Sequence, residues 1–300
     1  MIITRLAGGL GNQMFHYAIA RRHLRSSSEK IILDTRLLKE LETDIEKIVQ
    51  RPYYLHIFKE LKAEPLNDKL NTILTGKDIF NRIKKLFFIL NTAYVVQNGM
   101  TPIKVDVTNK RNIFFIGDFQ SELYFKDIRK ELMCDFCFPD LDSKNQYIKK
   151  KILNTPNALS IHVRRGDYHS LSNKNIFTSV NLNYYNNSIK YLQQQLGLRK
   201  LEAYLFTDDI EWAKTNFKSD SLNINFMGEN NSENGWKDMC LMASCQHHII
   251  ANSSFSWWGA WLSQRGGINL APQHWYLPNS NFFSIKDIVP ESWVIIDYPL

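Results

Sequence analysis

The amino-acid sequence predicts an α/β protein built on parallel β-sheets. Short apolar segments with the length of buried strands alternate with longer segments in which apolar residues recur at helical spacing. The chain has 300 residues, of which 44% are hydrophobic and 22% are charged, so it is long enough for two such domains. This composition excludes a disordered chain, a collagen-like repeat and a small disulfide-rich protein.

The first half of the chain begins with a predicted strand, a glycine-rich turn and a helix. These elements fall at Ile2–Leu6, Ala7–Gly11 and Asn12–Arg25. Further along, the pattern predicts a strand, a helix and a strand at Lys30–Asp34, Lys77–Asn91 and Asn112–Asp118. The segment from 37 to 106 is mixed and charged, and it gives no other clear pattern.

The second half of the chain is more regular. A polar, lysine-rich stretch from Asp140 to Asn157 predicts a linker, so we expect one domain over residues 1–150 and a second over residues 151–300. Strands are predicted at Ala158–Val163, Leu201–Phe206, Leu222–Phe226, His248–Ala251 and Ile268–Ala271, and helices at Leu182–Leu196, Ile210–Phe217, Gly235–Cys245 and Phe255–Gln264. Doubly wound sheets of this kind bind ligands at the carboxyl ends of their strands.

The positive charge of the chain is placed unevenly. The formal net charge is +7, and residues 1–150 contain 25 Lys and Arg against 18 Asp and Glu, whereas the second half is balanced. An excess of this kind suggests an anionic partner. The basic runs are short and no nucleic-acid-binding motif is present, so we expect no nucleic acid among the partners.

The predicted helix at Lys77–Asn91 is basic and amphipathic. Its apolar residues share one helical face, and its cations lie elsewhere on the helix. Two interpretations remain open. The helix either packs within the first domain or lies on an anionic membrane surface.

The glycine-rich turn precedes the first helix. Gly8, Gly9 and Gly11 allow a tight turn and a close approach of the backbone to a ligand. The helix that follows offers free N–H groups at its N-terminus, which suit a phosphate. A purely structural turn explains the glycines equally well.

The strand that begins at Ala158 runs into His162-Val163-Arg164-Arg165-Gly166-Asp167. Two guanidinium groups at the end of a buried strand are costly to desolvate unless they meet an anion, and arginine holds phosphate oxygens through two hydrogen bonds. Asp167 is placed to orient one of these groups. The alternative is an ion-paired turn on the surface.

Polar residues also follow two later strands. Asp208 and Asp209 come after Leu201–Phe206. A carboxylate at Asp208 suits the amide-like edge of guanine, and Asp209 is predicted to cap the next helix. The run from Asn252 through Ser253, Ser254 and Phe255 starts another helix whose N-terminus suits a diphosphate, with the phenyl ring suited to stacking on a base or sugar. Trp257, Trp258 and Trp261 are predicted to pack in the core.

These stretches together predict a metal-free site for a nucleoside diphosphate. Arginine and helix N-termini supply the positive charge that a metal ion would otherwise provide. Asp140-Leu141-Asp142 matches a metal-binding D-x-D string but lies in the predicted linker. Cys134 and Cys137 are interpreted as small core residues rather than zinc or redox ligands.

Three motifs in this order resemble glycosyltransferase family 11, the α-1,2-fucosyltransferases. They are Gly8 to Phe15, His162 to Asp167, and Asn252 to Trp261. The resemblance implies a GT-B-like fold of two Rossmann-type domains whose parallel sheets face each other across a cleft. It also implies inverting, metal-independent transfer of L-fucose from GDP-β-L-fucose to the 2-hydroxyl of a terminal galactose.

The resemblance also implies roles for individual residues. Arg164 resembles the arginine that binds the donor diphosphate, Arg165 is its neighbour, and Asn12 matches the asparagine beside the reaction centre. The other residues expected at the donor are Gly9, Gly11, His162, Asp167, Asp208, Asn252, Ser253, Ser254 and Phe255. No general base is assigned among His16, Asp118 and Glu122. The alternatives are transfer to another hydroxyl and a non-catalytic sugar-binding protein.

The expected partners are GDP-fucose and an oligosaccharide or lipid-linked glycan that ends in galactose. The apolar run within Met1 to Arg5 is too short for a signal peptide, and no charged segment precedes it. No apolar run approaches the roughly 20 residues that span a bilayer. We therefore expect a cytoplasmic protein, with peripheral contact to an anionic membrane as an open alternative.

Overall fold

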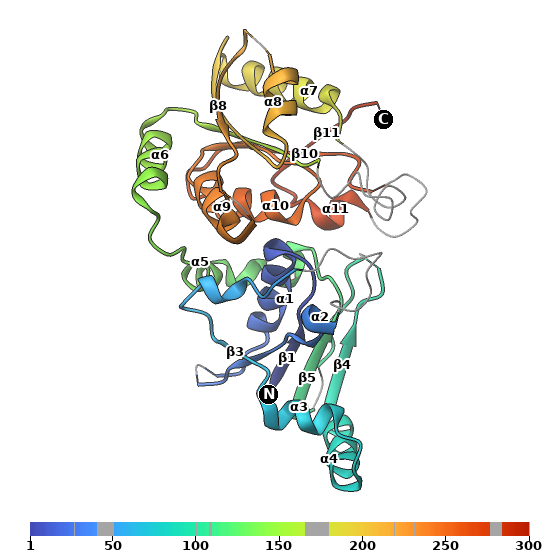
Figure 1. The fold of residues 1–300 in the computed structure, drawn as a ribbon. Helices are drawn as coiled ribbons and strands as arrows, with labels where there is room; N and C mark the ends of the chain where they lie inside the picture. The colour runs from blue at the N-terminus through green and yellow to red at the C-terminus, as the bar shows by residue number, and fades with distance from the viewer. Residues whose placement is uncertain are drawn as a thin grey trace. The chain divides into compact units, whose positions relative to one another are not determined.

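The chain folds into two compact α/β units (Figure 1). The computed structural model describes residues 1–26, 28–40, 51–99, 101–107, 110–165, 180–218, 220–230, 232–276 and 284–299. The first unit comprises Met1–Cys137 with Phe282–Asp287, and the second comprises Phe138–Asn281 with Ile288–Leu300.

The first unit contains a five-stranded sheet in the order β3-β2-β1-β5-β4, with every pair parallel. Its strands are β1 (Ile2–Arg5), β2 (Ile31–Asp34), β3 (Ala63–Pro65), β4 (Thr92–Val96) and β5 (Asn112–Ile116). Its helices are α1 (Leu10–Arg22), α2 (Arg36–Glu40), α3 (Asp68–Thr75), α4 (Ile79–Leu90) and α5 (Arg129–Asp135). The central strand β1 and helix α1 are almost wholly buried, which sets the position of the turn between them.

The second unit contains a six-stranded parallel sheet in the order β11-β10-β9-β6-β7-β8. Its strands are β6 (Leu159–Val163), β7 (Leu201–Thr207), β8 (Leu222–Met227), β9 (His247–Ile249), β10 (Asn269–Pro272) and β11 (Val294–Ile296). Its helices are α6 (Ser143–Asn154), α7 (Leu182–Leu196), α8 (Ile210–Asn216), α9 (Gly235–Ala243) and α10 (Ser254–Trp261), and α11 (Ile285–Ile288) lies where the chain passes back from the first unit.

Each face of the second sheet has its own apolar core. Alternate residues of β6, Leu159, Ile161 and Val163, pack with α7 on one face. On the other face, Tyr204 and Phe206 of β7 pack with residues of α6 and α9. Helices therefore cover both faces, so the parallel α/β class predicted from the sequence is confirmed.

The stretch predicted as a linker is instead the helix α6. Three of its four lysines are exposed and Lys149 is half-buried, while Ile152 is fully buried in a cluster with residues of α9. A helix that buries so few residues looks polar in the sequence. As a result, the predicted division after residue 150 falls within α6, whereas the two units divide between Cys137 and Phe138.

The interpretation of Cys134 and Cys137 as core residues is wrong, because both are exposed, and neither forms a disulfide. The buried position in this turn belongs to Asp135, which accepts hydrogen bonds from Tyr17 Oη at 2.7 Å and Arg21 Nε at 2.6 Å. The ion pair and the tyrosine hydroxyl satisfy this carboxylate, so an acid rather than a thiol occupies the core.

Helix α4 forms as predicted and contacts the first unit along one side. None of its residues is fully buried, but Phe88 packs against the apolar cluster that contains Leu70 and Leu74 of α3. The prediction that the helix packs within the first domain is therefore confirmed for that side, while its other faces are exposed. Among the helices that the structure describes, none has the length and apolarity required to cross a membrane.

Candidate functional site

Two arginines and two aspartates meet at the carboxyl edge of the second sheet. Strands β6 and β7 pair in parallel, with Val163 opposite Thr207, so the residues that follow the two strands are neighbours. Arg164 Nη1 lies 3.0 Å from Asp208 Oδ2. The backbone N–H of Arg165 donates to Asp208 Oδ1 at 2.9 Å. One carboxylate thus fixes both the side chain of Arg164 and the backbone after it.

Arg165 is held against helix α8. Its Nε lies 3.3 Å from Asp209 Oδ2, and its guanidinium carbon lies 3.9 Å from the centre of the Trp212 ring. Asp209 Oδ1 also accepts a hydrogen bond from the backbone N–H of Trp212 at 3.1 Å, which confirms its predicted role as the helix cap. Sequence reasoning missed Trp212, although its place three residues after the cap was a usable signal.

His162 is a buried, neutral histidine next to this cluster. Burial, reinforced by the charge of Arg164, lowers its pKa well below the ordinary value. No described residue lies within hydrogen-bond distance of its Nδ1 atom. Its ring lies 5.8 Å from that of Phe255, centre to centre. The structure therefore brings two of the predicted donor-binding residues together behind Arg164.

The turn between β9 and α10 supplies a helix N-terminus at the same edge. Asn252 is buried and its Nδ2 donates to the carbonyl of Trp275 at 2.8 Å. The hydroxyl of Ser253 accepts from the backbone N–H of Phe255 at 3.3 Å, so it caps α10, and Ser254 is the first residue of that helix. The N–H groups of this first turn carry partial positive charge that suits an anion.

The three tryptophans of α10 are core residues, as predicted. Trp257 and Trp258 are fully buried and Trp261 is nearly so. Their ring centres lie 5.0 to 6.0 Å apart. Trp257 Nε1 also donates to the carbonyl of Ile288 at 2.9 Å. This packing fixes the helix whose N-terminus reaches the candidate site.

The glycine-rich turn lies at the carboxyl end of β1, in the first unit. Gly8 adopts a φ of +67°, and a Cβ there would lie 2.3 Å from Asn12 Nδ2, so the turn needs glycine at this position. Gly9 is the N-cap of α1 and has open space around it. Gly11 is buried in the first turn of the helix. Gly8 is therefore the position in this turn where the backbone requires glycine, and it was not among the predicted donor-binding residues.

Amide side chains hold Asn12 and the turn in place. Asn12 Oδ1 accepts from Gln120 Nε2 at 3.3 Å. The buried Gln13 donates to the carbonyls of Gly8 at 2.9 Å and Pro52 at 2.8 Å, and its Oε1 accepts from the N–H of Tyr54 at 2.9 Å. Sequence reasoning did not single out Gln13, because the residue pattern does not show which segment lies opposite it.

Two buried titratable groups belong to the same unit. Burial lowers the pKa of His16 to about 4, and it raises the pKa of Asp118 above its ordinary value. His16 lies at the turn, since its Nδ1 accepts from the N–H of Ala7 at 3.4 Å. Neither group is assigned as a general base. Asp167, predicted to orient an arginine, lies outside the described residues.

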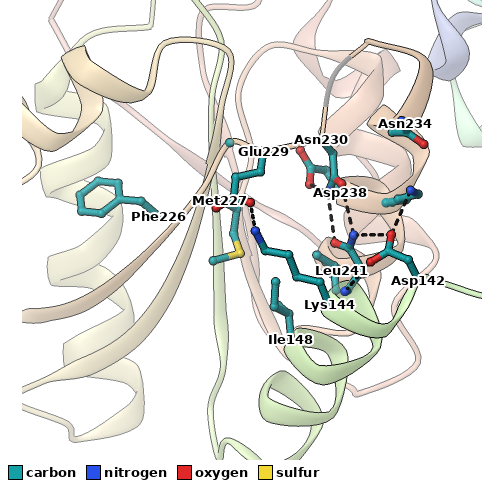
Figure 2. Close-up of a pocket in the computed structure, with 13 residues that line it drawn as sticks. Asp142, Lys144, Ile148, Phe226, Met227, Glu229, Asn230, Asn234, Asp238 and Leu241 are labelled. Atoms are coloured by element: carbon teal, nitrogen blue, oxygen red, sulfur yellow. Dashed lines mark hydrogen bonds and ion pairs between the residues drawn. The ribbon is translucent and has the colours of Figure 1, made fainter.

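A cavity of about 240 Å³ lies in the second unit, between α6, α9 and the end of β8 (Figure 2). Asn230 Nδ2 donates to Asp238 Oδ1 at 2.5 Å and to Asn145 Oδ1 at 3.2 Å. Asn145 in turn donates to Asp142, which pairs with Lys237 at 2.9 Å. Burial raises the pKa of Asp238 to about 6. None of these residues was predicted to bind the donor.

In the part of the chain that the structure describes, no cluster of three or more His, Cys, Asp or Glu residues could hold a metal ion. Asp142, the second acid of the D-x-D string, caps α6 and pairs with Lys237.

Comparison with known families gives a match along almost the whole chain. The family model described as glycosyl transferase family 11 matches residues 1–297. The chain belongs to glycosyl transferase family 11. Three of the residues placed above, Asn12, Arg164 and Ser253, lie in the motifs on which the resemblance to this family rested.

Several known proteins are similar to the chain in sequence. An alpha-1,2-colitosyltransferase of Escherichia coli is 33% identical over 99% of both chains. The O-antigen biosynthesis glycosyltransferase WbnK of Escherichia coli is 28% identical over 96% of this chain and 98% of the relative. The galactoside alpha-(1,2)-fucosyltransferase 1 of Homo sapiens is 29% identical over 47% of this chain and 39% of the relative.

Solved structures resemble the chain more distantly. The NodZ alpha-1,6-fucosyltransferase co-crystallised with GDP is 11% identical, with a TM-score of 0.47 over 86% of this chain and 91% of that chain. A single-residue mutant of FUT1 from Arabidopsis thaliana, in complex with GDP, is 9% identical, with a TM-score of 0.48 over 90% of this chain and 70% of that chain.

Proposed function

We propose that this family 11 member is an inverting glycosyltransferase that moves L-fucose from GDP-β-L-fucose to the 2-hydroxyl of a terminal β-galactoside. The observation that carries the proposal is the cluster at the carboxyl edge of the second sheet. There the motif arginine Arg164 and the N-terminus of α10 supply positive charge at the place where such sheets bind nucleotides.

In this proposal, Arg164 binds the donor diphosphate. Departure of GDP places negative charge on the phosphate oxygens, and a fixed guanidinium stabilises that charge more in the transition state than before it. Asp208 holds Arg164 in place through the 3.0 Å ion pair, and it remains our candidate for contact with guanine. Arg165, stacked on Trp212, orders the same loop.

The remaining predicted residues surround these two groups. His162 and Phe255, whose rings lie 5.8 Å apart, are assigned to the donor site beside Arg164, and Ser253 and Ser254 begin α10, whose first N–H groups face an anion in this proposal. Asn12, held by Gln120 in the first unit, is assigned to the reaction centre. Attack by the acceptor hydroxyl on the face opposite GDP converts a β-linked donor into an α-linked product.

The proposal is tested by incubating the protein with GDP-fucose and lactose. We expect GDP release that depends on lactose, together with a fucosylated trisaccharide whose new linkage is α-1,2 by nuclear magnetic resonance. Acceptor-dependent product with another linkage would favour the alternative fucosyltransferase. Sugar binding without GDP release, for every galactoside tried, would favour a sugar-binding protein.

A second candidate donor carries colitose in place of fucose. The relative named as an alpha-1,2-colitosyltransferase, 33% identical over 99% of both chains, favours this candidate. Colitose lacks the 3-hydroxyl of fucose, so a site built to hydrogen-bond that hydroxyl would discriminate strongly between the two donors. A comparison of kcat/KM for the two sugar nucleotides, with one acceptor, decides between them.

Transfer is expected to need no metal ion. The positive charge for the leaving diphosphate comes from Arg164 and from the N-terminus of α10 in this proposal. We therefore expect excess EDTA to leave the transfer rate within about twofold of its starting value. Loss of activity in EDTA that Mg²⁺ or Mn²⁺ restores would contradict this prediction.

A further inference from the structure

Helix α4 presents its apolar face to solvent. Six large apolar side chains share this face, and each is between 47% and 73% exposed: Ile79, Phe80, Ile83, Leu86, Phe87 and Leu90. Single exposed apolar residues are common on protein surfaces, but a contiguous stripe of six marks an interaction site.

The helix is attached to the first unit by its opposite side. With about 100° of rotation per residue, the six exposed residues fall within roughly one third of the circumference. Asn81 and Phe88 lie on the other side and are the two half-buried residues of α4. Phe88 packs against an apolar cluster that contains Leu70 and Leu74 of α3. The helix is therefore anchored by its back, and its apolar face is unpartnered among the described residues.

Positive charge borders the apolar face. On the same projection, Arg82 lies beside one edge of the face and Lys84 beside the other, and Lys77 and Lys85 add two more cations. Within Ile79–Leu90 the helix contains no Asp or Glu, and Asp78 caps its N-terminus. Long cationic side chains in these positions reach lipid phosphates while their stems cover apolar surface.

An open hollow continues this surface. Its volume is about 500 Å³, and Phe87 and Phe88 of α4 line it together with Met1, Asn91, Arg111 and Asn112. Phe87 thus belongs to both features, and Arg111 adds a further cation next to the apolar face. The apolar surface of α4 and the hollow form one patch with a cationic border.

We propose that α4 is the docking surface of this protein for an anionic lipid bilayer. Phe80, Phe87 and their neighbours enter the boundary between headgroups and acyl chains, while Arg82 and Lys84 contact the phosphates. A second copy of the chain does not fit this face, because pairing two α4 helices would bring like charges together. At 12 residues α4 is about 18 Å long, so it lies along the surface rather than crossing it.

The test is co-sedimentation of the full-length protein with lipid vesicles. We expect binding to vesicles of phosphatidylcholine with about one third phosphatidylglycerol, and at least tenfold weaker binding to phosphatidylcholine alone. The Phe80→Ser, Phe87→Ser variant should lose at least about tenfold in affinity. Since each cation near an anionic surface is worth about fivefold, Arg82→Glu with Lys84→Glu should lose at least about twentyfold.

Matched controls come from α6, a helix with exposed lysines whose apolar residue Ile152 is buried. Tyr147 and Leu153 of α6 are 72% and 47% exposed, so Tyr147→Ser with Leu153→Ser matches the apolar change. Lys149→Glu with Lys150→Glu, at one half-buried and one exposed lysine, makes the same change of charge as the α4 variant. Both controls should retain binding. Circular dichroism should show every variant folded.

Three outcomes would overturn the proposal. They are no binding to anionic vesicles, binding that the α4 variants leave unchanged, and a dimer in sedimentation velocity that Phe80→Ser with Phe87→Ser dissociates. The assay contains no sugar nucleotide and no acceptor. Its result is therefore independent of whether the proposed transfer reaction is correct.

Discussion

Arg164 is half-buried and paired with Asp208, which fixes the direction of its guanidinium. If this group binds the donor diphosphate, Arg164→Ala should lower kcat/KM for transfer at least about 100-fold, because a fixed charge at the leaving group is lost. The kcat/KM of Arg164→Lys should lie between those of the parent and Arg164→Ala, since lysine keeps the charge but not the paired hydrogen bonds. Initial rates with GDP-fucose measure both. Activity of Arg164→Ala within tenfold of the parent would contradict the assignment.

Gly8 and Gly9 provide a matched pair for the turn before α1. Gly8→Ala should destabilise the protein by about 1 to 3 kcal/mol, because φ is +67° and the new Cβ would displace Asn12. Gly9→Ala meets open space at a φ of −77°, so it should cost only the lower preference of alanine for the N-cap position, less than about 1 kcal/mol. Denaturant unfolding measures both. Equal losses for the two variants would refute this account of the turn.

The sequence predicts some residues of the candidate site well and others not at all. Asp209 was predicted as a helix cap because its interaction is local, with a backbone N–H three residues on. The pairing of Arg164 with Asp208 joins residues 44 positions apart, and it depends on which strands are neighbours. For the same reason, the sequence did not suggest Asp208 and Asp209 as partners of the arginines. The prediction for Asp167 lies outside the described residues.

At the scale of elements, Asp209 links helix α8 to the candidate site. Asp209→Asn keeps the oxygen that caps the helix, so we expect its stability within about 0.5 kcal/mol of the parent. Asp209→Ala removes the cap and should cost about 1 kcal/mol. Both substitutions remove the ion pair to Arg165 Nε. Thermal unfolding distinguishes them, and equal destabilisation by both would place the contribution in the ion pair rather than the cap.

Helices with local end signals were predicted more accurately than those without. The predicted limits of α7, Leu182–Leu196, are those observed, because Asn181 caps its start and Gly197 adopts the left-handed conformation at its end. Helix α6 was missed because it buries only a narrow apolar stripe. The short strands β3 and β11 were also missed. Three residues carry too little pattern to reveal a strand whose position depends on its neighbours.

At the scale of the whole molecule, buried histidines should make stability depend on pH. Burial lowers the pKa of His16 and His248 to about 4, and it lowers that of His162 as well. Between pH 6.5 and these lowered values the unfolded chain binds protons that the folded chain does not. The free energy of unfolding should therefore fall on acidification, by up to about 1.4 kcal/mol per pH unit for each histidine.

Protonation of Asp238 should make the folded protein more stable as the pH falls, which is opposite to the effect of the histidines. A variant at this position therefore serves as a control. The pKa of Asp238 is raised to about 6, so below that pH the folded chain takes up a proton more readily than the unfolded chain. Replacing it by Asp238→Asn removes that compensation, and the loss of stability between about pH 7 and pH 5 should become steeper. Urea unfolding at the two pH values measures the slope. A shallower slope in the variant would contradict the raised pKa.

The fold class could be predicted because it rests on the alternation of strands and helices, which the pattern shows directly. The strand orders β3-β2-β1-β5-β4 and β11-β10-β9-β6-β7-β8 could not, since parallel pairing joins segments far apart in sequence. The charge excess of the first half was visible in the sequence, but its meaning was not. Only the structure shows that cations on α4 border an apolar face turned to solvent.

The position of α4 within the first unit has a consequence for acceptor choice. The C-terminal end of α4 lies at the edge of the sheet where the strands begin, because Phe87 of α4 and Asn112 of β5 line the same hollow. Asn12 lies at the opposite edge, after the carboxyl end of β1. Strand β5 has five residues, so the two edges are roughly 15 Å apart. Held on a bilayer by α4, the first unit would act as a spacer. If both proposals hold, a sugar bonded directly to the lipid would lie about this distance short of Asn12, and a sugar farther out on the glycan would reach it.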